Sequence, residues 1–107
     1  MGLYDLEDEE NSKPYSIEAE EALLGSVFIN PNVIGDIVDI VTVEDFYKNN
    51  YKLIFSEMIK AYNMGKIIDV LLIIESLKKQ ELIDEIGGED IIYDLTEVVP
   101  TAANAVN

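Results

Sequence analysis

The chain of 107 residues has room for one small domain, and 49% of its residues are hydrophobic, enough to build a buried core without cross-links. It contains no cysteine and no histidine, which excludes disulfides, thiolate metal sites, cysteine nucleophiles and the usual zinc ligands. Seven lysines, no arginine and 22 acidic residues give a formal charge of −15, so electrostatic repulsion opposes binding to nucleic-acid phosphates. This charge favours a basic or weakly charged protein as the partner.

Residues 1–13 are predicted to form a disordered acidic tail. Their large apolar side chains are Leu3, Tyr4 and Leu6, which are too few to offset the entropy cost of ordering. The acidic start is the opposite of a signal or transit peptide, and no apolar run approaches the roughly 20 residues that a membrane-spanning helix needs. We therefore expect a cytoplasmic protein without membrane contact.

An acidic helix is predicted over residues 17–29. Ser16 can cap its first turn, and three carboxylates near its start meet the positive end of the helix dipole: Glu18, Glu20 and Glu21. We expect these carboxylates to lie on a solvated face rather than to work as an acid–base pair. Gly25 costs this helix about 1 kcal/mol unless another backbone approaches it closely.

The middle of the chain is predicted to contain a short helical segment and one long helix. The short segment follows Pro31 and continues to Val41, and Thr42 can cap one further turn. The clearest helical stripe covers residues 51–64, after which Gly65 supplies a left-handed stop.

Two further helices complete an all-α fold. Asp69 can cap a helix that ends in Lys78 and Lys79, at the negative end of its dipole. Residues 70–74 also fit a buried strand, but no second run of comparable length exists to pair with it. After a glycine pair, a last helix is expected over residues 89–99. The predicted fold class is a compact orthogonal bundle of about five to six helices.

No catalytic motif is present. The only Gly-Lys pair, Gly65-Lys66, lacks the other residues of a phosphate-binding loop, so we do not expect ATP hydrolysis by this chain. Tyr47 and Tyr51 lie near two lysines, but a chain of charge −15 does not offer the positive groove in which aromatic residues stack on single strands. We interpret Tyr51 as a core residue and Tyr47 as half-exposed. The residues alone therefore indicate an acidic helical interaction module.

Five segments, in this order and spacing, resemble the N-terminal domain of bacterial replicative DNA helicases, the DnaB family. They are residues 16–25 (SIEAEEALLG), 44–47 (EDFY), 53–55 (LIF), 86–88 (IGG) and 99–104 (VPTAAN). The resemblance covers about residues 14–107. It implies a hexameric parent protein that unwinds duplex DNA with a C-terminal motor, where ATP and Mg²⁺ bind. This chain is expected to hold no cofactor of its own.

The resemblance also implies a domain organisation and a set of partners. Residues 14–100 would form the globular helical domain, and residues 101–107 would begin the connection to a helical hairpin that this chain lacks. In the family, N-terminal domains form a collar on which the C-terminal domain of primase docks. Without the hairpin, a monomer or weak dimer is expected. Other helicase subunits and a helicase loader are further expected partners, and direct contact of this domain with nucleic acid is not expected.

The expected partner-binding residues are Glu18, Glu21, Ile91 and Tyr93. Glu18 matches a family carboxylate implicated in primase docking, although stabilisation of the helix dipole explains it equally well. Ile91 stands where many family members carry a tyrosine, and Tyr93 follows two residues later. No catalytic or metal-binding residue is expected. A different class of function stays open, namely a stand-alone acidic protein-binding module or nucleic-acid mimic.

Overall fold

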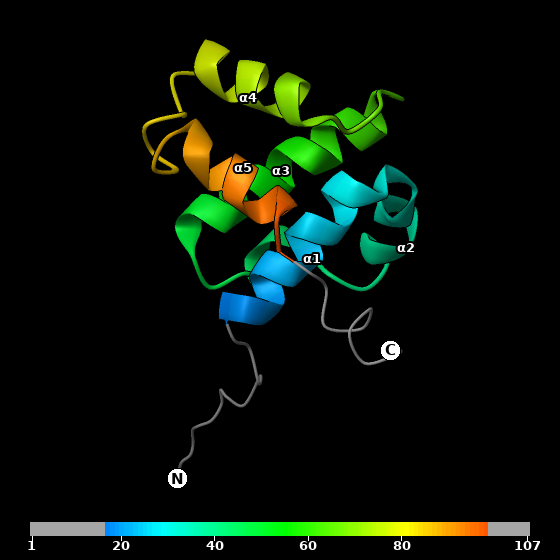
Figure 1. The fold of residues 1–107 in the computed structure, drawn as a ribbon. Coiled ribbons are helices and arrows are strands. Elements are labelled where there is room, and N and C mark those ends of the chain that lie inside the picture. The colour runs from blue at the N-terminus through cyan, green and yellow to red at the C-terminus, as the bar shows by residue number, and fades with distance from the viewer. Residues whose placement is uncertain (1–16, 99–107) are drawn as a thin grey trace, which may run out of the picture.

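The computed structural model describes residues 17–98, and all structural statements below refer to this part of the chain (Figure 1). Its five α-helices are α1 (Ile17–Ile29), α2 (Ile34–Ile37), α3 (Asn49–Asn63), α4 (Val70–Lys79) and α5 (Glu89–Thr96). Two single-turn 3₁₀-helices flank α2, namely η1 (Pro31–Val33) and η2 (Val43–Asp45). No strand occurs between residues 17 and 98, which confirms the all-α prediction. The predicted tail at residues 1–13 and connection at residues 101–107 lie outside the described residues.

The long helix α3 lies at the centre of the bundle. It contacts α1, α2, α4 and η2, while α5 packs on α1 and also touches α4 (Figure 1). The core between these helices is mainly apolar, and its largest fully buried side chains are Leu24, Val27, Ile54, Phe55, Met58, Leu77, Ile86, Ile92 and Leu95. Burial of these side chains supplies the main driving force for folding.

Helices α1 and α4 have the boundaries that the sequence predicts. Asp69 caps α4, because its Oδ2 accepts hydrogen bonds from the backbone N–H groups of Leu71 (3.1 Å) and Leu72 (3.3 Å). Residues 70–74 are therefore helical, and the alternative of a buried strand is wrong. The left-handed stop after α3 is also confirmed, since Gly65 has a φ of +72°.

Four other boundaries differ from the prediction. The helical segment expected up to Val41 ends at Ile37. Gly35 and the β-branched residues of this segment have low helix propensity, which weakens the helix. Helix α3 begins two residues earlier than predicted, at Asn49, and ends one residue earlier, at Asn63; in its first turn the Asn50 side chain donates a hydrogen bond to the distant Ile86 carbonyl (3.1 Å). Helix α5 ends at Thr96, whose hydroxyl donates to the Tyr93 carbonyl (2.6 Å), and its predicted end at residue 99 lies outside the described residues.

Helices α1 and α5 meet in direct backbone contact at Gly25. A Cβ atom at this position would lie 2.5 Å from the carbonyl oxygen of Leu95 and 3.6 Å from that of Val98. Because the obstacle is backbone, it cannot rotate away. This is the close approach that the presence of glycine inside α1 requires, and it confirms that reading of the sequence.

We expect Gly25→Ala to lower the free energy of unfolding by about 1–3 kcal/mol, because the clash outweighs the gain in helix propensity. Gly35→Ala in α2 is the matched control, since its Cβ would meet only the hydroxyl end of the Tyr62 side chain, at 3.3 Å. Urea unfolding of both variants measures the difference. Equal stability of the two variants would contradict the close contact between α1 and α5.

Glu57 is a buried carboxylate that joins α3 to α4. It forms an ion pair with Lys60 (2.8 Å), and it accepts hydrogen bonds from the Ser76 hydroxyl (2.6 Å) and the Gln80 amide (3.0 Å). Burial by itself raises the pKa of Glu57, but the hydrogen bonds from Lys60, Ser76 and Gln80, together with the charge of Lys60, lower it overall below its ordinary value. The folded state therefore favours the ionised form of this side chain.

The stabilising contribution of Glu57 should depend on pH. Because its folded pKa is lowered, the contribution is complete above the unfolded pKa, about 4.3, and is lost as the pH falls through the folded pKa. We expect Glu57→Gln to be about 1–3 kcal/mol less stable than the wild type at pH 7 and to lose less further stability below about pH 4.5. Urea unfolding at several pH values measures this, with exposed Glu75→Gln as the control. Parallel pH profiles for Glu57→Gln and the wild type would contradict it.

Candidate functional site

The three carboxylates at the start of α1 lie in three different environments. Glu18 is exposed, Glu21 is half-buried and Glu20 is only 4% exposed. The prediction of a shared solvated face is therefore correct for Glu18 and wrong for Glu20. The reason is helical geometry, since Glu20 lies four and seven residues before the buried Leu24 and Val27 and so shares their face.

Glu20 ties the segment after η2 to α1. Its Oε2 accepts a hydrogen bond from the backbone N–H of Tyr47 (2.8 Å), whereas its buried Oε1 has no hydrogen-bond partner. The neighbouring Phe46 is buried and packs against Phe55, with 4.9 Å between the ring centroids. The contact between Glu20 and Tyr47 spans 27 residues of sequence, so Glu20 acts here as a structural group.

Glu21 is bound to the start of α3. The hydroxyl of Tyr51 donates a hydrogen bond to its Oε2 at 2.6 Å. Burial raises the pKa of Tyr51, and so do this hydrogen bond and the negative charges of Glu21, Glu20 and Asp94. The hydroxyl therefore remains a donor at all physiological pH values. Tyr51 is buried, as predicted, whereas Tyr47 is 78% exposed and thus more accessible than expected.

The two expected residues on α5 differ in accessibility. Ile91 is half-buried against the core, and a Cβ atom at Gly87 would lie 3.2 Å from its Cγ1. Tyr93 is 41% exposed, because it points away from the face that buries Ile92 and Leu95. The four predicted partner-binding residues thus lie on two helices that pack together, two on α1 and two on α5. The exposed residue on α1 is Glu18, and the exposed residue on α5 is Tyr93.

The described carboxylates do not gather into a metal-binding cluster. Between residues 17 and 98, no group of three or more histidine, cysteine, aspartate or glutamate side chains is placed to hold a metal ion. Glu20 and Glu21 are already engaged in hydrogen bonds with the protein itself. None of the helices in this part of the chain combines the length and apolar character needed to cross a membrane.

The chain belongs to the family described as the DnaB-like helicase N terminal domain, whose family model matches residues 12–107. This match confirms the resemblance that the sequence motifs indicate. Residues 12–107 thus correspond to the N-terminal domain of DnaB-like helicases.

Two curated relatives carry the name replicative DNA helicase. The chain is 38% identical over 95 residues to DnaB of Geobacillus stearothermophilus, which covers 89% of this chain and 21% of that protein. It is 32% identical over 91 residues to DnaC of Bacillus subtilis (strain 168), which covers 85% of this chain and 20% of that protein. The chain therefore spans about a fifth of the length of these relatives.

A solved structure shares the fold. The crystal structure of the N-terminal domain of DnaB helicase from Mycobacterium tuberculosis matches with a TM-score of 0.78 and 28% sequence identity, covering 86% of this chain and 67% of that chain. The observed helical bundle is thus the fold of a known DnaB N-terminal domain.

We expect Glu20→Ala to lower the free energy of unfolding by about 1–3 kcal/mol, because the backbone N–H of Tyr47 loses its acceptor. Glu18→Ala, two residues earlier on the exposed face, is the control and should change stability by less than about 0.5 kcal/mol. Thermal unfolding followed by circular dichroism measures both. A loss of equal size in the two variants would show that Glu20 has no special structural role.

Proposed function

We propose that this chain is the assembly and docking domain of a cytoplasmic replicative DNA helicase, where it joins helicase subunits in a hexameric ring and binds the C-terminal domain of primase. Membership of the DnaB-like N-terminal family supports the helicase part of this proposal. The observation that carries the docking part is the exposed carboxylate of Glu18 at the start of α1, next to a helix, α5, that presents the exposed ring of Tyr93.

The charge of the chain supports a protein partner with a basic surface. Within the described part, Glu18 forms no ion pair, so its carboxylate is available to a lysine or arginine of a partner. A net charge of −15 also accelerates encounter with a basic protein and repels DNA phosphates. The domain would therefore recruit a protein while staying off the DNA that the helicase unwinds.

The chemistry of unwinding belongs, in this proposal, to another part of the helicase. The chain carries no phosphate-binding loop, so ATP and Mg²⁺ would bind in the C-terminal motor of the parent protein. The relatives are about five times longer than the matched segment, which leaves length for such a motor. A helicase loader is a further partner in this proposal.

Calorimetric titration with the C-terminal domain of primase from the same organism tests the docking proposal. We expect saturable binding, and we expect Glu18→Lys to weaken it about fivefold or more, because an attractive charge pair becomes repulsive. Asp39→Lys, which makes the same charge change at an exposed position after α2, is the control and should have a smaller effect.

Two outcomes would contradict docking at Glu18. One is the absence of binding by the wild-type chain up to high micromolar concentration. The other is an equal loss of affinity in Glu18→Lys and Asp39→Lys, which would indicate a general effect of net charge rather than a contact at α1.

A further inference from the structure

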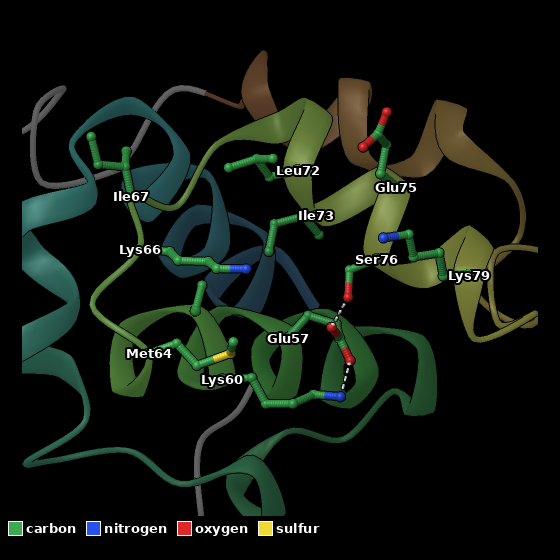
Figure 2. Close-up of a pocket in the computed structure, with 11 residues that line it drawn as sticks. Glu57, Lys60, Met64, Lys66, Ile67, Leu72, Ile73, Glu75, Ser76 and Lys79 are labelled. Atoms are coloured by element: carbon green, nitrogen blue, oxygen red, sulfur yellow. Dashed lines mark hydrogen bonds and ion pairs between the residues drawn. The ribbon is translucent and has the colours of Figure 1, made fainter.

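A groove lies between the second half of α3 and α4, and it extends along α4 as far as Lys79 (Figure 2). It encloses about 180 Å³. Its apolar wall includes Met64, Ile67 and Leu72, whose exposed fractions of 65%, 74% and 49% are large for such side chains. Three exposed apolar side chains beside one groove indicate a binding surface for another apolar segment.

The groove also gathers positive charge in a strongly acidic chain. Lys60, Lys66 and Lys79 line it, which is three of the seven lysines, against the carboxylates of Glu57 and Glu75. Glu57 neutralises Lys60, but Lys66 and Lys79 form no ion pair between residues 17 and 98. Figure 2 shows the Lys66 ammonium group extending into the groove between the two helices. The groove therefore offers apolar surface together with two unpaired cations.

We propose that this groove binds residues 3–10 (LYDLEDEE) of the same chain. This segment, which lies outside the described residues, interleaves apolar and acidic side chains. Leu3, Tyr4 and Leu6 supply the apolar contacts, and the carboxylates that follow them pair with Lys66 and Lys79. A segment too poor in apolar residues to fold alone becomes ordered when it gains such contacts by binding.

The connecting chain is long enough for this contact. Eleven residue steps separate Leu6 from Ile17, the first residue of α1, and an extended chain of that length spans about 36 Å. Helix α1 has 13 residues and is about 20 Å long. Just beyond its end, Pro31 lines a hollow shared with Lys66. A segment that runs back along α1 therefore reaches the groove, and its tether gives it a high effective concentration there.

The test compares two intact 107-residue chains, the wild type and a tail variant that carries Leu3→Ser, Tyr4→Ser and Leu6→Ser. A fluorescent peptide of residues 1–13 is titrated into each, and its anisotropy is measured. We expect the peptide to bind the tail variant about tenfold or more tightly than the wild type, because the wild-type groove is already occupied by its own tethered segment.

Lysine variants made in the tail variant locate the binding site. Lys66→Glu and Lys79→Glu should each weaken peptide binding about fivefold. Lys78→Glu is the matched control, since Lys78 is the neighbour of Lys79 on α4 but pairs with Glu89 (3.4 Å) and does not line the groove. It should weaken binding less than about twofold. Circular dichroism checks that each variant is folded, and all three lysines are exposed.

Three results of the peptide titrations would overturn the proposal. They are the absence of saturable peptide binding to the tail variant, equal affinity of the peptide for the two chains, and an equal loss in Lys78→Glu, Lys66→Glu and Lys79→Glu. Dimerisation seen by light scattering, abolished by Leu72→Ser but unchanged in the tail variant, would assign the groove to a second copy of the chain and also overturn it. The primase titration depends on Glu18 and is read out separately, so the two proposals can fail independently.

Discussion

The contact between α1 and α5 at Gly25 is the constraint on which the rest of the arrangement depends. The absence of a side chain lets the carbonyl of Leu95 approach the α1 backbone, and this crossing holds α1 at a fixed position against α5. From that position, α1 directs Glu20 inward to Tyr47 and Glu21 to Tyr51, which connects it to the segment after η2 and to α3. In the same position of α1, the Glu18 side chain is exposed to solvent. The position of α1 and the helical spacing of its residues together place Glu20 and Glu21 against the rest of the fold and leave Glu18 exposed.

Local signals predicted the helices whose ends are set by their own residues. Asp69 caps α4 and Gly65 ends α3, so both boundaries can be found from the sequence. The start of α3 could not be found in this way, because Asn50 bonds to Ile86, 36 residues away, and this partner is invisible to a local pattern. The burial of Glu20 depends similarly on a partner 27 residues away. Its spacing from Leu24 and Val27 was the available signal, and the abundance of acidic residues around it concealed that signal. The accessibility of Tyr93 relative to Ile91 likewise depended on how α5 packs.

The acidic composition has two separate roles in this molecule. Two glutamates, Glu20 and Glu57, are buried and bonded to groups on other segments, so they contribute to the fold. Exposed carboxylates such as Glu18 contribute to the negative electrostatic potential at the surface of the domain. The lysines also differ in their surroundings. Lys66 and Lys79 both line one groove, whereas Lys52 and Lys78 form ion pairs elsewhere. The positions of the charged side chains therefore predict binding surfaces better than the net charge of −15 does.

The Gly25 crossing also has a mechanical consequence. A Cβ atom at Gly25 would lie 3.6 Å from the carbonyl oxygen of Val98, so the crossing joins the middle of α1 to the last described residue. At this crossing the two backbones meet directly, with no side chain of residue 25 between them. The spacing of α1 and α5 is therefore set at this point by backbone atoms, which cannot change rotamer, rather than by side chains.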